Sequence, residues 1–332
     1  MLPYFLLVFL NLGGRFLAGF LSRFRHRRSL LSTHGQKKRA AVFRLKIVGY
    51  RPHNWKILEK LLILLDDKRN DIYLHIDLKS DFIDFSSKVH NANLFIFHEI
   101  DVRWGDISLI QVEFFLFKTA YCKGNYSYYH LISGSDLPLK TQDEIHAFFD
   151  AHYPTEFIGF SLGMTCDNRI NKVYIFPKYQ RIKNRYGNKV LCLLRSFCVF
   201  LQNLLNYNHY KLKDKLMIGP EWVSITEQSV SLILSKEKII MKQYRFASCG
   251  DEVYKQTIIG NSFLFNSVYD KVDDYKGCMR FIDWNKGNPY IFRSIDFEQL
   301  MSSDRMFARK FDEKVDFDIV ERIFEALDKQ KR

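Results

Sequence analysis

"NWKILEKLLILLDDKRNDIYLHID", residues 54–77, is typical of a helix, a polar turn and a strand in succession. Apolar residues recur at helical spacing over Asn54–Leu65, and "DDKRND" then turns the chain into a buried strand that ends at Asp77. The preceding "LKIVGY", residues 45–50, has the composition of another strand. Together these segments predict a β-α-β unit of an open α/β sheet, in which ligands gather beyond the carboxyl ends of the strands.

The rest of the body continues this alternation of strands and helices. Further strands are expected at residues 93–99, 126–134, 156–162, 221–226, 279–284 and 290–294. Helices are expected at residues 108–121, 144–149, 190–205, 251–259, 297–302 and 317–327. Because no repeat or second boundary interrupts the body, we expect a single domain over residues 45–330, preceded by a separate segment over residues 1–44.

Composition and charge exclude several classes of protein. With 332 residues, 47% of them apolar, the chain can bury a large core. Its six cysteines form no C-x-x-C pair, which indicates neither a zinc pattern nor a disulfide framework and fits a reducing compartment. The net charge of +13 is concentrated in residues 1–45, which hold nine basic residues and no acid. The body is only mildly basic and carries no nucleic-acid-binding signature, so we expect no nucleic-acid partner.

The N-terminal segment "MLPYFLLVFLNLGGRFLAGFLSRFRHRR" is apolar enough for a membrane role. Asn11, Gly13, Gly14 and Arg15 interrupt the run of about 20 apolar residues that a spanning helix needs. The segment is therefore open to three readings: an interfacial basic-aromatic anchor, a spanning helix, or a poorly ordered leader. Each leaves the body on the cytoplasmic side, associated with the inner membrane surface through residues 1–28 in the first two. Residues 32–44 then form a polar, basic linker.

The sequence contains none of the common phosphate loops, no nucleophile elbow and no H-E-x-x-H zinc motif. The only D-x-D, Asp316-Phe-Asp318, begins the last predicted helix, and helix capping explains it better than metal binding. A bound diphosphate would therefore need side-chain cations, which "FRSIDFEQLMSSDRMFARKFD" (292–312) supplies as Arg293, Arg309 and Lys310.

Seven stretches of the chain resemble the core-2/I-branching β-1,6-N-acetylglucosaminyltransferases, a family that includes the peptide O-xylosyltransferases. They occur in the family's order and cover about residues 45–325: "NDIYLHIDLKSDF", "VRWGDISLI", "YYHLISGSDLPLKT", "GPEWVSIT", "DEVYKQTIIGNS", "RFIDW" and "MFARKFD". The resemblance implies an α/β glycosyltransferase A-type, Rossmann-like fold, with a mixed central sheet flanked by helices. It also implies an inverting transfer from a UDP-sugar that needs no metal and no other cofactor.

The resemblance gives Glu252 the role of the general base, which takes the proton from the acceptor hydroxyl. The "CGDEV" sequence is also typical of a helix N-terminus, where the helix dipole helps to keep a carboxylate ionised. By itself that pattern would favour simple capping by Asp251 and Glu252. With the resemblance, we expect Asp251 to be the capping or supporting residue and Glu252 to be catalytic.

The resemblance also implies a donor-binding set. Arg293 and Lys310 match the family positions that hold the UDP diphosphate, and Arg309 lies beside them. Asp77 matches the position that contacts uridine, although a turn-forming role would explain it too. Arg103 and Trp104 lie in a loop that the family places against the nucleotide, and Trp104 is equally well explained as a core residue.

Acceptor and sugar contacts are implied for a further group of residues: Asp136, Glu156, Glu221, Trp222 and Trp284. An indole face suits the C–H face of a pyranose ring, and a carboxylate can bond sugar hydroxyls. Each position also has a structural explanation, which is a strand-ending turn for Asp136 and an ordinary surface acid for Glu156. The first strand departs from the family pattern at "VGYRPHN", which leaves uracil contacts at Val48 and Gly49 in doubt.

The resemblance therefore implies a transferase that moves N-acetylglucosamine from its UDP-sugar to a glycan acceptor. UDP-xylose is the alternative donor, favoured by "FARKFD" and "FIDW". A membrane-attached glycan-binding protein without turnover is the alternative from another class of protein. Retention of Glu252, Arg293 and Lys310 argues against it.

Overall fold

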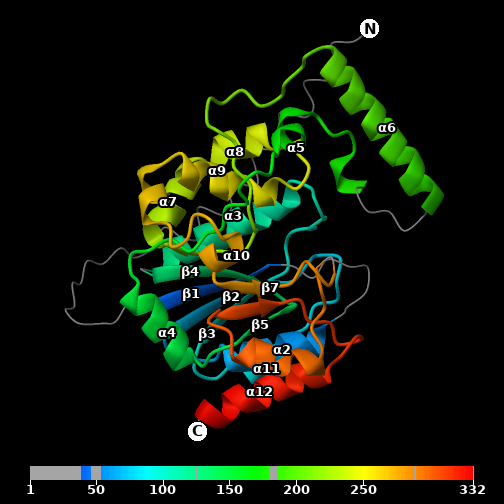
Figure 1. Ribbon diagram of the computed structural model, residues 1–332. Coiled ribbons are helices and arrows are strands. Elements are labelled where there is room, and N and C mark those ends of the chain that lie inside the picture. Colours follow the sequence, from blue (N-terminus) through cyan, green and yellow to red (C-terminus); the bar gives the residue numbers. More distant parts are fainter. Residues whose placement is uncertain (1–38, 46–53, 125, 180–184, 288, 332) are drawn as a thin grey trace. The chain divides into compact units, whose positions relative to one another are not determined.

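A five-stranded mixed sheet forms the centre of the computed structural model, which describes residues 39–45, 54–124, 126–179, 185–287 and 289–331 (Figure 1). The strand order is β3-β2-β1-β4-β6. Their bounds are Arg39–Leu45 for β1, Asn70–His75 for β2, Asn93–Phe97 for β3, Tyr126–Ser133 for β4 and Ser224–Thr226 for β6. β1 to β4 are parallel and β6 is antiparallel to β4. The order 3-2-1-4 is that of a Rossmann-like sheet, so the predicted fold class is confirmed.

The first strand corrects the predicted domain boundary. β1 pairs with β2 and β4 and thus lies inside the sheet, although most of its residues, Arg39 to Arg44, were expected to belong to a basic linker. The compact unit that holds the sheet begins at Lys38. Residues 46–53 lie outside the described part of the chain, and with them Val48, Gly49 and most of the predicted strand 45–50. The predictions for the leader, residues 1–28, lie outside it as well.

Both faces of the sheet are buried, because successive side chains of a strand point to opposite faces. On β2, Tyr73 belongs to one hydrophobic core and its neighbours Ile72 and Leu74 belong to the other. The first core includes residues of α3 (Ser108–Lys123), α7 (Glu227–Ser235) and α9 (Tyr254–Gly260). The second includes residues of α2 (Trp55–Leu64), α4 (Gln142–Ala151) and α12 (Asp318–Lys331). Helices therefore cover the sheet on both sides, as predicted.

A second, three-stranded sheet was only partly predicted. Its order is β5-β8-β7, with bounds Asp136–Pro138 for β5, Phe307–Arg309 for β8 and Arg280–Ile282 for β7. Only β7 was expected, because three-residue strands carry too short a pattern to detect. The strands predicted at residues 156–162 and 290–294 are wrong, since the first makes only isolated bridges at Glu156 and Phe157.

Arg280 fastens the two sheets together. Its side chain is buried, and it donates to the carbonyl oxygens of Cys278 at 2.7 Å, Val223 at 3.2 Å and Leu131 at 3.3 Å. The guanidinium also lies 4.5 Å from the centre of the Phe307 ring. Burial lowers the pKa of Arg280 to about 10. This cation therefore has a structural role, which the motif "RFIDW" did not reveal.

The described residues form further helical elements besides these. They are α5 (Asp167–Asn171), α6 (Arg185–Leu204), α8 (Glu237–Gln243), α10 (Asp274–Gly277), α11 (Phe297–Met301), η1 (Ser86–Lys88), η2 (Pro177–Tyr179), η3 (Gly250–Glu252), η4 (Phe263–Ser267) and η5 (Ser294–Asp296). Within the described part of the chain, no helix is both long and apolar enough to cross a bilayer.

Candidate active site

The turn that carries Glu252 is built by close packing and one left-handed residue. Cys249 has φ 53°, and its N–H donates to the carbonyl oxygen of Gly105 at 3.0 Å. Gly250 follows, where a Cβ atom would lie 2.8 Å from Cδ1 of Tyr244, so a larger residue does not fit without movement. Residues 250–252 form η3, and α9 begins two residues after Glu252. The predicted helix start is therefore confirmed, with a 3-10 turn in place of its first residues.

Glu252 is half-buried and pairs with a cation that the sequence did not indicate. Its Oε2 accepts from Nη1 of Arg169 on α5 at 2.6 Å, and 40% of the side chain remains exposed. Burial and the nearby carboxylate of Glu221 raise the pKa of Glu252, while Arg169 acts in the opposite direction. The net direction is upward, because desolvation by burial is the largest of these effects.

Beneath this turn lies a buried ion pair. Nζ of Lys255 contacts Oε2 of Glu113 at 2.5 Å, and the side chains of both residues are at most 1% exposed. The hydroxyl of Tyr254 also donates to Glu113, and Lys255 donates to the carbonyl oxygen of Asp251 at 2.9 Å. Burial raises the pKa of Glu113 to about 7. The only sequence signal for this cluster was a charged residue inside an apolar stretch of each of two helices, α3 and α9.

The segment 219–222 approaches Glu252 from another direction. The N–H of Gly219 donates to the carbonyl oxygen of Glu252 at 3.0 Å, and Gln256 donates to the carbonyl oxygen of Pro220 at 2.7 Å. Glu221 and Trp222 follow directly, so the structure brings Glu221 and Glu252 together, as the effect on the pKa of Glu252 also shows. Trp222 is 9% exposed, and the guanidinium of Arg309 lies 3.8 Å from its ring centre.

Arg309 and Asp136 form one buried unit. Nη1 of Arg309 lies 3.2 Å from Oδ1 of Asp136 and donates to Oγ of Ser133 at 3.1 Å. Asp136 itself is fully buried and accepts from N and Oγ of Ser133, both at 2.7 Å. The carboxylate of Asp136 therefore closes the turn and fixes Arg309. It does not present an accessible surface to sugar hydroxyls, which corrects the expected sugar contact.

The other two diphosphate candidates lie beside this unit. The N–H of Phe292 donates to the carbonyl oxygen of Lys310 at 2.9 Å, so the backbone next to Arg293 runs along the backbone of Lys310. The side chain of Arg293 is exposed and that of Lys310 is half-buried. Trp284, which follows β7, is 43% exposed. Of the two predicted indoles, Trp284 is the more accessible to a sugar.

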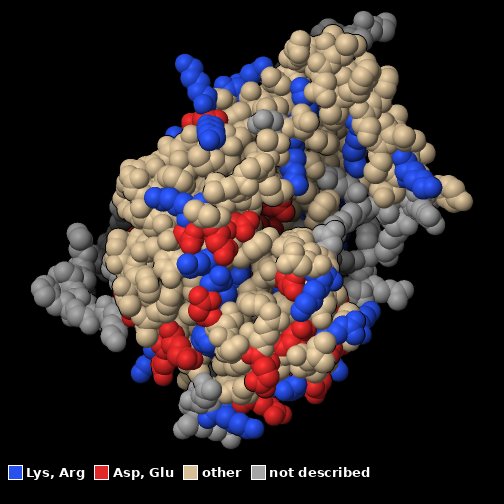
Figure 2. Space-filling view, in the orientation of Figure 1, with Lys and Arg blue, Asp and Glu red and all other residues tan. Residues whose placement is uncertain are grey.

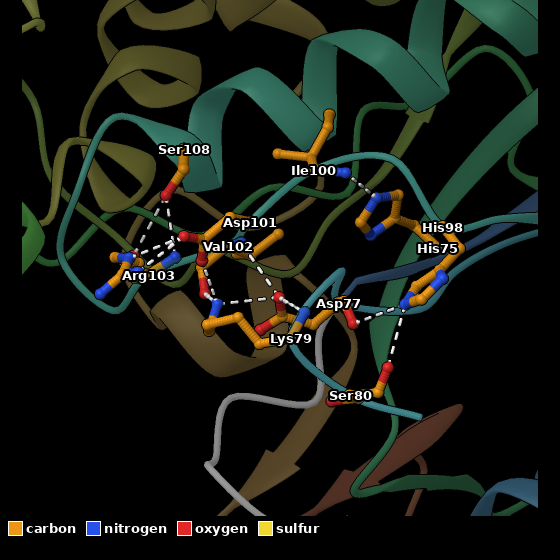
Figure 3. A network of polar contacts seen from close by, with 10 residues as sticks. All are labelled: His75, Asp77, Lys79, Ser80, His98, Ile100, Asp101, Val102, Arg103 and Ser108. Atoms are coloured by element: carbon orange, nitrogen blue, oxygen red, sulfur yellow. Dashed lines mark hydrogen bonds and ion pairs between the residues drawn. The ribbon is translucent and has the colours of Figure 1, made fainter. Parts of the chain in front are cut away.

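The expected nucleotide residues gather at the carboxyl end of β2 (Figure 3). Asp77 is fully buried, and its Oδ1 accepts from Nζ of Lys79 at 2.8 Å and from the N–H of Val102 at 3.2 Å. Lys79 also pairs with Asp101, whose Oδ2 in turn lies 2.7 Å from Nη2 of Arg103. Oδ2 of Asp77 has no hydrogen-bond partner among the described residues. The network thus fixes the loop that carries Arg103 and the half-buried Trp104.

This loop is also tied to the turn that carries Glu252. Gly105, the next residue after Trp104, accepts the hydrogen bond from Cys249 at 3.0 Å. The guanidinium of Arg103 lies 5.8 Å from the ring centre of Tyr179. Tyr179 follows α5 in the chain, and α5 carries Arg169, which pairs with Glu252. Stretches from four parts of the sequence therefore converge around one turn.

Glu156 has a structural role. It is fully buried, and its carboxylate accepts from Oγ1 and N of Thr226, at 2.5 and 2.9 Å. Thr226 is the residue that caps α7. The expectation that Glu156 contacts the acceptor is therefore corrected, and the alternative of an ordinary surface acid is wrong as well.

The capping explanation of the D-x-D motif is confirmed. Asp316 accepts from N of Ile319 at 3.2 Å and from N of Ser294 at 2.9 Å, and Asp318 accepts from Oγ of Ser294 at 2.8 Å. Across the described ranges, no three His, Cys, Asp or Glu side chains are grouped as a metal site requires.

A family model and a human protein both match most of this chain. A family model described as "Branch: Core-2/I-Branching enzyme" matches residues 51–302. A human protein named beta-1,3-galactosyl-O-glycosyl-glycoprotein beta-1,6-N-acetylglucosaminyltransferase is 24% identical over 311 residues, which cover 83% of this chain and 67% of the relative.

Two solved structures are also similar. The apo form of mouse xyloside xylosyltransferase 1 is 11% identical with a TM-score of 0.33, and the match covers 82% of this chain and 96% of that one. TarS of S. aureus is 12% identical with a TM-score of 0.24, and the match covers 39% of this chain and 23% of TarS.

Proposed function

The chain belongs to the core-2/I-branching enzyme family and is a glycosyltransferase, and we propose that it works by inversion and without a metal ion. It would move a sugar from a UDP-sugar to a hydroxyl group of a glycan acceptor. The observation that carries the proposal is the position of Glu252. It is a half-exposed carboxylate at the meeting point of the nucleotide loop, the Glu221 segment and α5.

The reaction is a single displacement. The carboxylate of Glu252 takes the proton of the acceptor hydroxyl while the oxygen of that hydroxyl bonds to the anomeric carbon. On the opposite side, the bond from the anomeric carbon to UDP breaks, and UDP leaves with the electron pair. Lys310 and Arg293 would bind the diphosphate and stabilise its growing negative charge.

The environment of Glu252 suits a base that must be ionised and yet hold a proton. Burial and Glu221 raise the pKa of Glu252 and make the carboxylate a better proton acceptor. Arg169 lowers that pKa and keeps the carboxylate charged before the acceptor binds. The net effect raises the pKa of Glu252 toward the neutral range in which a general base works best.

We propose UDP-N-acetylglucosamine as the donor, with UDP-xylose as the second candidate. The named activity of the human relative supports the first. The motif "FARKFD", which places Arg309 over Trp222, supports the second, because that contact covers an indole face that a larger sugar would need. A lipid-linked or surface polysaccharide precursor at the cytoplasmic face of the inner membrane is the proposed acceptor, on the evidence of the basic-aromatic leader.

UDP release measured over a panel of UDP-sugars, with and without EDTA, tests this proposal. We expect turnover with one donor that EDTA leaves intact, and a decrease of kcat by about 10² to 10⁴-fold in Glu252→Gln. Asp251→Asn, one residue away, is the matched control and should keep a larger share of the activity. Strict dependence on a divalent metal would contradict the metal-free mechanism. Failure to turn over any UDP-sugar would favour a glycan-binding protein instead.

A further inference from the structure

Helix α6 turns its polar side toward the protein. Nε and Nη2 of Arg195 donate to the carbonyl oxygens of Ile175 and Phe176, at 3.0 and 2.6 Å. Gln202 accepts from the N–H of Val173 at 2.8 Å and donates to its carbonyl oxygen at 2.9 Å. Arg195 and Gln202 lie two turns apart on the same side of the helix, because seven residues make about two helical turns. These four hydrogen bonds fix the rotation of α6 about its own axis.

The opposite side of α6 is apolar and exposed. We call it the outer stripe, and it consists of Tyr186, Val190, Leu193, Leu194, Phe197, Phe200, Leu201 and Leu204. These residues recur at intervals of three and four, so they occupy one face, and each is between 38% and 80% exposed. A surface helix of a globular protein normally buries such a face. An apolar face of this extent marks a surface that binds something else.

The sequence around α6 holds many cations and almost no acids. Between Lys172 and Lys215 the sequence holds ten Lys and Arg residues and one acid, Asp214. In the described part of this stretch the exposed cations are Lys178, Lys189, Lys211, Lys213 and Lys215. In the space-filling view, side chains of other types cover the region of α6, with Lys and Arg at its margins and no Asp or Glu over the helix (Figure 2).

We propose that the outer stripe of α6 docks on an anionic lipid bilayer, with the helix lying in the plane of the interface. Apolar side chains enter the boundary between headgroups and acyl chains, and the flanking cations bind the anionic headgroups. Such one-sided helices with aromatic and aliphatic residues on one face and basic residues beside it are typical of interfacial binding.

The charge pattern favours lipid over the other occupants. A second copy of the chain would bring the same cations against each other across the stripe. The sequence of residues 1–38 has the same sign of charge, with seven basic residues and no acid. An anionic bilayer is the occupant that is apolar inside and opposite in charge at its surface. This proposal concerns binding alone and does not depend on the transfer reaction.

Vesicle co-sedimentation with the full-length protein tests the docking. One set of vesicles consists of phosphatidylcholine, and the other also contains phosphatidylglycerol. The test variant combines Leu193→Gln, Phe197→Gln and Phe200→Gln, all on the outer stripe. Its matched control combines Ile239→Gln, Phe263→Gln and Val272→Gln, whose side chains are 42%, 66% and 77% exposed elsewhere on the protein. Thermal unfolding monitors whether each variant keeps its fold.

We expect the wild type to bind the anionic vesicles more strongly than the neutral ones. The stripe variant should bind at least about tenfold more weakly, since the affinity scales with the buried apolar area, and the control should bind like the wild type. Reversing the charges in Lys178→Glu with Lys189→Glu should weaken binding to the anionic vesicles only. If the stripe variant binds like the wild type, another segment holds the membrane and the proposal is wrong. A dimer that the stripe variant disrupts, without any vesicle binding, would overturn it in favour of a second copy. Binding is read without any donor, so loss of turnover leaves this result unaffected.

Discussion

The carboxylate side and the cation side of the proposed active site are held in different ways. On the carboxylate side, Glu252 belongs to a turn whose backbone bonds to Gly105 and Gly219 and which rests on the buried pair of Glu113 and Lys255. On the cation side, Arg309 is fixed by Asp136 and Trp222, but Arg293 is exposed and Lys310 is half-buried.

The difference separates residues that hold the base in place from residues that would contact the substrate. A base must lie within hydrogen-bond reach of one proton, so its position has to be built in advance. Cations that bind a diphosphate act over longer distances and can adjust, because a Lys ammonium is a mobile point charge. Variants that remove the support should therefore cost stability, and variants that remove the contacts should cost substrate binding.

Removal of Glu113 should have the largest effect on stability. Glu113→Ala leaves the Lys255 ammonium buried without its counter-ion, which typically costs about 3–5 kcal/mol of unfolding free energy. Urea denaturation measures the loss. The double variant Glu113→Leu with Lys255→Met removes both charges and should recover much of it. A loss below about 1 kcal/mol in Glu113→Ala would show that water reaches the Lys255 site.

Arg309→Ala should come next, and mainly as a loss of stability. The substitution removes the ion pair between Arg309 and the fully buried carboxylate of Asp136, and a lost charged hydrogen bond costs about 1.5–3 kcal/mol. Denaturation and donor KM should be measured together. An unchanged stability with a large rise in KM would instead place Arg309 among the residues that contact the donor.

Lys310→Ala should impair donor binding more than stability, the opposite of what we expect for Arg309→Ala. Half-buried Lys310 should contribute little to stability, and its loss should raise the donor KM about tenfold, which corresponds to about 1.4 kcal/mol. Arg293→Ala should behave in the same way, because Arg293 is exposed. Steady-state kinetics with the preferred UDP-sugar measure both. A melting temperature as low as that of Arg309→Ala would contradict the division drawn here.

The smallest effects are expected in the pH profile, where two variants should act in opposite directions. Arg169 lowers the pKa of Glu252, so Arg169→Met should move the acid limb of kcat/KM to higher pH. Glu221 raises that pKa, so Glu221→Gln should move the limb to lower pH. The limb moves in the same direction as the pKa of Glu252, because the base is active only when it is ionised. Shifts in the same direction in both variants would mean that another group controls this limb.

The sequence predicted the long elements of the fold well. β2, β3, β4, α2 and α3 all lie where period and composition placed them, because each has enough residues to show its pattern. The short strands β5 and β8 were missed, and β1 was placed several residues too late. A basic composition hid β1, since a strand inside a sheet is recognised by its neighbours more than by its own residues.

The candidate site divides in the same way. The resemblance to the family indicated Glu252, Lys310 and Arg293, and their roles in catalysis and diphosphate binding stay predictions. The turn-forming role of Asp136 was one of two explanations that the sequence left open. The burial of Glu156 was not foreseen, since a carboxylate has the same letter whether it lies in water or in the core.

The sequence by itself determined the α/β class, the family and the set of charged residues available for catalysis. Only the tertiary structure decided which of those charged residues are buried and which are accessible. It also showed the pairs of Arg169 with Glu252 and of Glu113 with Lys255, which no motif indicated. It also turned the apolar side of α6 outward. The reason is physical: burial and ion pairing depend on residues far apart in the chain, and a local pattern carries no information about them.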